Sequence, residues 1–204
     1  MNAIARRLPW SDVFLGRLRL APIAGQVAVF DDPDGLGYLR SPDWAARYAG
    51  NEESGVKLAT AYRIMQNVVG LELVAVPSDG AADTTAAGRE VAPCRGCHFD
   101  GWFALDRVAA VLPRKGERFD AYRGGPREIL GGIPVANDEE LVRALVASED
   151  FAVHACRLSF AYLYGRRDGA CDGPLLDPCV DAFRKDGAIT SALRTIAADP
   201  SFCE

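Results

Sequence analysis

The chain has 204 residues, 49% of them hydrophobic and 25% charged, so it holds enough apolar side chains to form a core without metal or disulfide support. Its formal net charge is −5, and it lacks the basic runs that would follow a phosphate backbone, which argues against nucleic acid as a partner. No stretch approaches the roughly 18 consecutive apolar residues of a transmembrane helix.

The first third of the chain indicates little regular structure. Residues 1–50 are rich in Pro, Gly and Asp, with a turn cluster at Asp31–Gly35, and a helix is expected to begin at Pro42. An amphipathic helix is predicted over Glu53–Val69, because its apolar side chains recur on one helical face and a glycine follows it. We therefore expect residues 1–76 to form an N-terminal segment with one amphipathic helix.

The next segment contains the most informative motif of the sequence. Residues 77–92 are predicted to be a linker, and Cys94-Arg95-Gly96-Cys97-His98 follows them, which is the Cys-x-x-Cys-His pattern of c-type haem attachment. Two thiols on one helical turn can each form a thioether with a haem vinyl group, and the adjacent His98 can ligate the iron. With six cysteines and two histidines, chance would produce such a run on the order of 0.002 times in a chain of this length.

After the motif the pattern is mainly helical. A short helix is predicted over residues 103–112, and a loop or short hairpin over residues 113–136. Four further helices are expected: one after Asn137, which forms a capping-box pattern with Glu140, one from Ser148 to about Tyr164, one from Pro174, and one over Ile189–Ala198. We predict a mainly α fold in which residues 77–204 form a cytochrome c-like haem-binding domain with a helical C-terminal extension, or one continuous module with the N-terminal segment.

The remaining cysteines bear on the compartment. Cys156, Cys171, Cys179 and Cys203 allow three pairings, and the sequence does not choose between them. Two disulfides between the C-terminal helices are expected in an oxidising compartment, and four buried free thiols are the alternative. Because haem is normally attached outside the cytoplasm, we expect a periplasmic or cell-surface protein whose export signal is absent from this sequence.

Three segments carry a family resemblance: Thr60–Gly70, the haem motif with Gly101–Asp106, and the helices Asn137–Phe151 and Leu158–Arg166. In this order they resemble the planctomycete-type cytochrome c modules, paired domains of unknown function that are also common in myxobacterial proteins. The resemblance covers roughly residues 35–203 and implies a haem-bearing module. It transfers neither a distal ligand nor a reaction. The family has Asp-Pro shortly after the haem histidine, where this chain has Asp100 followed by Gly101, and Cys or Asn at the position of His154.

The far side of the iron would decide the chemistry, because Met or His there gives an electron carrier and an open position permits small-molecule chemistry. His154 is the preferred distal ligand, since it lies on the apolar face of a later helix, and a hydrogen-bonded core histidine is the alternative. Met65 is the second candidate ligand, although methionine at such a position also serves as a core residue. The candidates for contacts with haem propionates are Arg95, Trp102, Arg107, Arg114 and Arg123, which can equally be surface charges and a packed tryptophan.

The sequence thus predicts a single-haem c-type cytochrome that holds one covalent haem c and exchanges electrons with a redox partner protein. A haem enzyme or a gas- or peroxide-reactive haem protein with an open sixth site is one alternative, and a haem-bearing module of a larger surface assembly is another. A thioredoxin-like site fits less well, because the cysteine pair follows a linker rich in Pro and Gly instead of a strand. A zinc site fits less well too, because the later cysteines form no second Cys-x-x-Cys pair.

Overall fold

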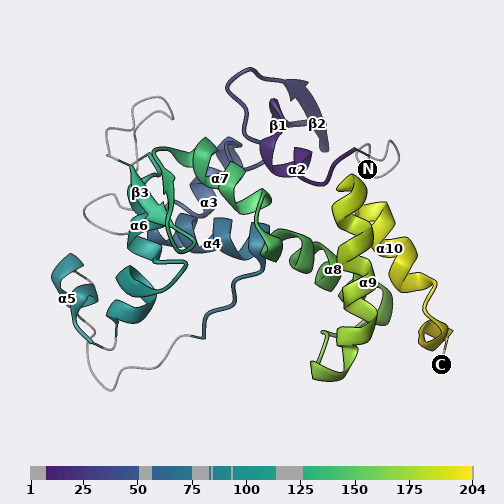
Figure 1. Ribbon diagram of the computed structural model, residues 1–204. Helices are drawn as coiled ribbons and strands as arrows, with labels where there is room; N and C mark the ends of the chain where they lie inside the picture. The colour runs from purple at the N-terminus through teal and green to yellow at the C-terminus, as the bar shows by residue number, and fades with distance from the viewer. Residues whose placement is uncertain are drawn as a thin grey trace. The chain divides into compact units, whose positions relative to one another are not determined.

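The computed structural model describes residues 8–50, 57–74, 83, 85–92, 94–113 and 126–203 (Figure 1). It confirms the mainly helical class, since helices dominate the described part and two small antiparallel sheets of two strands accompany them. None of the helices in this part is long and apolar enough to cross a membrane.

The chain divides into two compact units that interleave along the sequence. Unit 1 comprises Met1–Ser41, Val68–Gly70 and Leu145–Glu204, and unit 2 comprises Pro42–Asn67 and Leu71–Ala144. Neither unit coincides with the segments 1–76 and 77–204. The boundary between those segments falls outside the described residues and stays a prediction.

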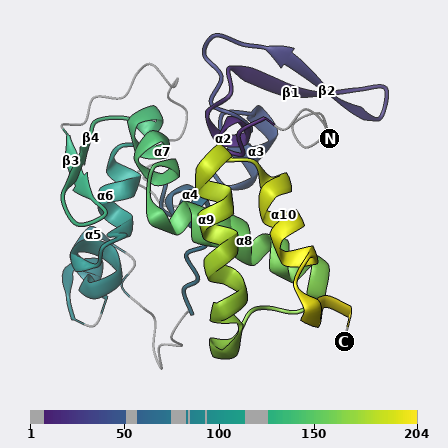
Figure 2. The ribbon, with the colours of Figure 1, turned by 45° about the vertical axis from the view of Figure 1, so that its right-hand side comes forward.

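Unit 1 is built around three helices that lie side by side, α8 (Glu149–Tyr164), α9 (Gly173–Asp186) and α10 (Ile189–Ala197) (Figure 2). Helices α8 and α9 each end at a glycine in the left-handed region, Gly165 with φ 67° and Gly187 with φ 66°, where a Cβ would be strained. These helices confirm the predicted C-terminal elements. Two short 3₁₀ turns accompany them, η3 (Ala170–Asp172) and η4 (Pro200–Cys203).

A disulfide joins α8 to α9. The sulfur atoms of Cys156 and Cys179 lie 2.07 Å apart, and both side chains are fully buried. This pair confirms one of the two expected disulfides and makes the alternative of four free thiols wrong. Cys171 is an exposed free thiol, so it forms no second disulfide, and the side chain of Cys203 lies outside the described part.

The N-terminal part of unit 1 contains a β-hairpin, which makes the expectation of irregular structure over residues 1–50 wrong for this stretch. Strand β1 (Leu18–Ile23) pairs antiparallel with β2 (Gln26–Asp31). Ala24 and Gly25 connect them, both at positive φ (48° and 77°). A two-residue turn of this conformation has a twist that matches the twist of the paired strands. A proline inside β1 and the lack of the usual Asn-Gly turn concealed this pairing in the sequence.

A short helix precedes the hairpin and anchors the N-terminal part of unit 1. In α2 (Asp12–Leu15) the buried ring of Phe14 contacts the rings of Tyr38 and Phe151, with centroid distances of 5.7 and 5.8 Å. Phe151 belongs to α8, so an aromatic cluster connects the start of the chain to the three helices.

Unit 2 contains the predicted haem motif and the elements around it. In chain order these are α3 (Pro42–Arg47), α4 (Leu58–Val69), α5 (Ala86–Glu90), the π-helical turn η1 (Gly96–Asp100), α6 (Leu105–Ala110), β3 (Arg127–Ile129), β4 (Ile133–Val135) and α7 (Asp138–Val146). The last residues of α4 and of α7 are assigned to unit 1.

Most of the predicted elements in this part are confirmed. Helix α3 begins at the predicted proline, and α4 confirms the amphipathic helix from Leu58 onward, while residues 53–56 lie outside the described part. The hairpin β3–β4 confirms the hairpin interpretation for the end of the segment 113–136. The side chain of Asn137 accepts a hydrogen bond from the N–H of Glu140 (2.9 Å), as expected of a cap. The linker predicted over residues 77–92 is wrong for residues 86–90, which form α5.

Candidate haem attachment site

The two thiols of the motif lie on one helical turn. The backbone N–H groups of Cys97 and His98 both donate to the carbonyl oxygen of Cys94, each at 3.2 Å. Residues three positions apart on such a turn share a face. Both cysteines are free and exposed. The helical turn that the motif requires is therefore present, and both of its thiols are accessible to a reactant.

The turn widens into a π-helix that begins at Gly96, two residues after the first cysteine. The N–H of Gly101 donates to the carbonyl oxygen of Gly96 at 2.7 Å, which closes η1. A Cβ on Gly101 would lie 2.7 Å from that same oxygen and 3.4 Å from the ring of Phe103. Proline at this position would lack the N–H that η1 uses. This geometry gives a physical reason for glycine at position 101.

The imidazole of His98 is oriented by a carboxylate. Its Nδ1 lies 2.7 Å from Oδ2 of Asp106, which stands in the first turn of α6. The side chain of Asp106 is only 10% exposed and that of His98 24% exposed, so water competes little for this hydrogen bond. A carboxylate accepts hydrogen bonds, so this contact favours the tautomer with the proton on Nδ1, in which the basic atom Nε2 on the other edge of the ring is left for a ligand.

The same carboxylate is also held by Arg89, which contacts both of its oxygens. The guanidinium Nε lies 3.1 Å from each carboxylate oxygen, and Nη2 lies 2.7 Å from Oδ1. Both side chains of this pair are 10% exposed, which makes it a largely buried, multiply hydrogen-bonded ion pair. Such a fork fixes the plane of the carboxylate as well as its position. Arg89, Asp106 and His98 therefore form a chain of contacts, which we call the Arg–Asp–His relay.

Helix α5 presents Arg89 to the relay, and local capping explains where α5 begins. The hydroxyl of Thr85 accepts a hydrogen bond from the N–H of Gly88 at 3.2 Å. The carboxylate of Asp83 accepts one from the N–H of Thr85 at 2.9 Å, and the hydrogen bonds from the Thr85 side chain and backbone lower the pKa of Asp83. A Cβ on Gly88 would collide with Asp83, so the glycine lets this cap close.

The apolar side chains near the motif in sequence are partly buried and partly exposed. Helix α6 buries Leu105, Val108 and Ala109 in unit 2, which holds Asp106 in place beside them. Two large apolar side chains near the motif in sequence stay exposed instead, Val91 at 57% and Trp102 at 44%. The carbonyl oxygen of Trp102 accepts a hydrogen bond from the N–H of Leu130 at 2.9 Å, so the hairpin β3–β4 supports the segment after the motif.

The predicted distal ligands lie in different units. Met65 is fully buried in the part of α4 that belongs to unit 2, the unit of His98. His154 is half-buried on α8 in unit 1, where its ring faces Gly70 so closely that a Cβ on that glycine would meet Nδ1. The choice between these two ligands stays a prediction.

The residues proposed for haem propionates are partly placed. Arg95 forms an exposed ion pair with Asp100 at 2.8 Å, and Arg107 is exposed on α6. Arg114 and Arg123 lie outside the described residues. Neither Arg95 nor Arg107 belongs to the Arg–Asp–His relay.

Sequence reasoning missed two members of this site. Asp106 had a detectable signal, because a ligating histidine usually donates its other ring N–H to a carboxylate or carbonyl, and an acidic residue at the start of the next helix is well placed for this. Arg89 had no such signal, because its segment was predicted to be a linker.

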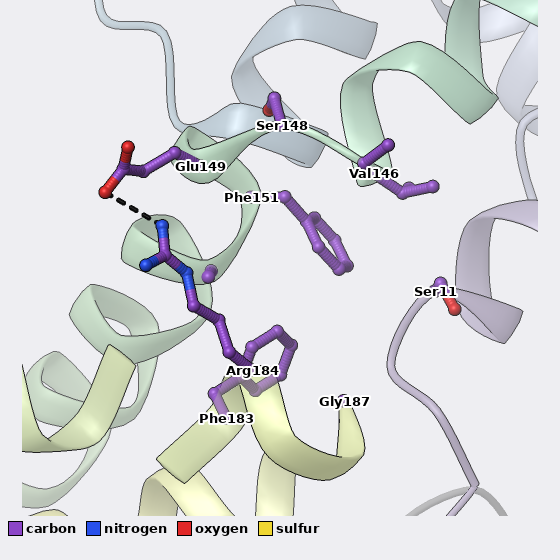
Figure 3. A pocket seen from close by; sticks show the side chains of 10 residues that line it. Ser11, Val146, Ser148, Glu149, Phe151, Phe183, Arg184 and Gly187 are labelled. Carbon is purple, nitrogen blue, oxygen red and sulfur yellow. Dashed lines mark ion pairs between the residues drawn. The ribbon is translucent and has the colours of Figure 1, made fainter. Parts of the chain in front are cut away.

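A hollow in unit 1 is a second candidate for a functional site (Figure 3). It measures about 270 Å³, below the range of most ligand pockets, and Phe151 and Phe183 are among the residues that line it. The charged groups on it, Glu149 and Arg184, pair with each other at 2.8 Å. This hollow fits an imperfection in the packing of α8 and α9 better than a reactive site.

Comparisons with known proteins add no name to this site: no family model matches the chain, and neither the curated proteins nor the solved structures include a significant match. Among the described residues, no group of three or more His, Cys, Asp or Glu side chains is arranged to hold a metal ion. A haem brings its own nitrogen ligands to the iron. The donor set here, two exposed thiols and one oriented imidazole, suits that group.

Proposed function

We propose that this chain is a c-type cytochrome that carries one covalent haem c and transfers electrons. The observation that carries the proposal is the pairing of two exposed thiols on one helical turn with an adjacent histidine whose Nδ1 is bound to a carboxylate. Exposed thiols can react, and a histidine oriented in this way is the form in which proteins offer imidazole to a metal. The resemblance to the planctomycete-type cytochrome c modules supports the haem-bearing part of this proposal.

Each residue of the motif has a defined part in holding the group. The thiols of Cys94 and Cys97 would each add across a vinyl group, with sulfur bonding to one carbon and the thiol hydrogen going to the other, so that no oxidant is consumed. His98 would bind the iron through Nε2. Val91 and Trp102, exposed at 57% and 44%, provide apolar surface that a porphyrin can cover. The bound haem supplies reversible one-electron chemistry at its iron.

The proposal includes a compartment and a partner. The disulfide between Cys156 and Cys179 is typical of an oxidising compartment, which is where haem is attached to such motifs. We therefore place the protein in the periplasm or at the cell surface, with a redox protein as its partner. His154 is retained as the proposed distal ligand and Met65 as its alternative.

A spectroscopic experiment tests the proposal. The chain is matured together with a haem-attachment system, denatured, and examined as its pyridine haemochrome. The wild type should give the α band of a haem with two thioether bonds, and Cys94→Ala or Cys97→Ala should each give the band of a haem with one. Cys171→Ala is the matched control, because this cysteine is also free and exposed but lies outside the motif. A wild-type protein that retains no haem after denaturation and acid-acetone extraction would refute the proposal.

A further inference from the structure

The relay has a role beyond attachment. We propose that Asp106 and Arg89 are positioning residues that hold His98 in a single tautomer, with the proton on Nδ1, and that their charge balance sets the reduction potential of the site. The statement about the tautomer concerns the chain alone, and the statement about the potential rests on the proposed function.

The tautomer follows from the donors and acceptors. Asp106 offers acceptor oxygens only, and the distance of 2.7 Å between its Oδ2 and Nδ1 of His98 is that of a charge-assisted hydrogen bond. A hydrogen bond to a charged group contributes about 1.5–3 kcal/mol, enough to favour one tautomer about tenfold or more. Nε2 is therefore the ring nitrogen whose lone pair is available to a metal before any ligand binds.

Arg89 gives the relay its rigidity and limits its charge. Its guanidinium contacts both oxygens of Asp106, so the carboxylate cannot rotate away from His98 without breaking that fork. A carboxylate that is 90% shielded from water is costly without such a partner. The positive charge also offsets part of the negative charge that His98 experiences. Removing Asp106 and removing Arg89 should thus change the electric field at His98 in opposite directions.

The effect on a bound haem has a definite sign. A carboxylate on Nδ1 makes Nε2 a stronger donor to the metal. A stronger donor stabilises ferric iron more than ferrous iron and so lowers the reduction potential. Loss of the negative charge at Asp106 should raise the potential, and loss of the positive charge at Arg89 should lower it. A purely structural role for this ion pair would not produce opposite shifts.

The first test uses the protein without haem. Nitrogen-15 NMR at mildly alkaline pH reports which ring nitrogen of a neutral imidazole carries the proton. The chain has two histidines, so a His154→Gln variant assigns the signals. His98 should be protonated on Nδ1 in the wild type, and Asp106→Asn should move the tautomer ratio toward Nε2–H by about tenfold or more. A wild-type His98 protonated mainly on Nε2 would overturn the proposal, and this result needs no variant of the relay.

The second test uses the haem-loaded protein and redox titration. Asp106→Asn should favour the ferrous state by about tenfold or more, which is about 59 mV for one electron, and Arg89→Gln should shift the potential in the other direction. Asp100→Asn is the matched control. It removes the same charge two residues after His98, but Asp100 is half-exposed and pairs with Arg95, so its shift should be much smaller.

The outcomes separate the two proposals. Equal shifts for Asp106→Asn and Asp100→Asn, or shifts of the same sign for Asp106→Asn and Arg89→Gln, would overturn the tuning role. If no haem is attached to the wild type, the proposed function fails, while the NMR result still decides whether the relay fixes the tautomer of His98.

Discussion

Replacing Cys156 and Cys179 together with alanine should lower the free energy of unfolding of unit 1 by about 3 kcal/mol. The disulfide closes a loop between residues separated by 23 positions. The chain-entropy relation gives a loss of about 3 kcal/mol at 25 °C when a loop of this length is opened in the denatured chain. Both sulfurs are fully buried, so the small voids that alanine leaves should add to this loss.

The assay must report on unit 1 by itself. The chain has three tryptophans, and replacing Trp44 and Trp102 with phenylalanine leaves Trp10 as the sole fluorophore. Trp10 belongs to unit 1, where its backbone N–H donates to the carbonyl oxygen of Gly187 at 2.7 Å. Unfolding in urea, followed by the emission of Trp10, then measures the stability of that unit.

Cys171 provides the control for this measurement. It is free and exposed, so Cys171→Ala should change the free energy of unfolding by no more than about 0.5 kcal/mol. If the variant without the disulfide loses less than about 1 kcal/mol, or loses no more than the control, the link between Cys156 and Cys179 does not constrain the denatured chain, and the reasoning fails.

Three further predictions concern single side chains. In the haem-loaded protein, His154→Ala should shift the Soret band and the reduction potential while Met65→Leu should not; an unchanged spectrum for His154→Ala would exclude this histidine as the distal ligand. Gly70→Ala should lower the free energy of unfolding by about 1 kcal/mol or more in thermal denaturation, because Gly70 has φ +73° and the new Cβ would meet the ring of His154. The hydrogen bond from Arg166, followed by one from a backbone N–H, lowers the pKa of Asp172 from 3.8 to about 2. Its contribution to stability is therefore present above pH 3.8 and is lost as the pH falls through about 2, and an NMR titration of Arg166→Gln should show the pKa of Asp172 raised toward its ordinary value, with the backbone hydrogen bond still lowering it in part.

The C-terminal helices could be predicted because residues close in sequence determine where these helices begin and end. Gly165 and Gly187 adopt the left-handed conformation that ends α8 and α9, and Asn137 caps α7 through its own side chain. Capping and helix termination act over three or four residues, so a short window of sequence contains all the groups involved. A short window of sequence did not predict strands β1 and β2, since their pairing depends on two segments and neither segment carries a strong strand signal.

The disulfide shows what the sequence can indicate about a cysteine pairing and what only the packing of the helices decides. The count of cysteines and the predicted helices indicated a link between C-terminal elements, but the choice of Cys179 as the partner of Cys156 depends on how α8 lies against α9. Cys171 is nearer to Cys156 in the sequence and stays free. Sequence separation alone does not bring two Cα atoms within bonding reach of each other.

The sequence by itself indicated the proposed haem attachment, because Cys94, Cys97 and His98 lie within five consecutive residues and their spacing on one turn is a local property. Only the tertiary structure decided how His98 is held. Asp106 and Arg89 come from helices on either side of the motif, α6 and α5; Asp106 contacts His98, and Arg89 contacts Asp106. A buried carboxylate needs partners, and which partners it finds depends on the folded arrangement of helices and not on any short pattern of residues.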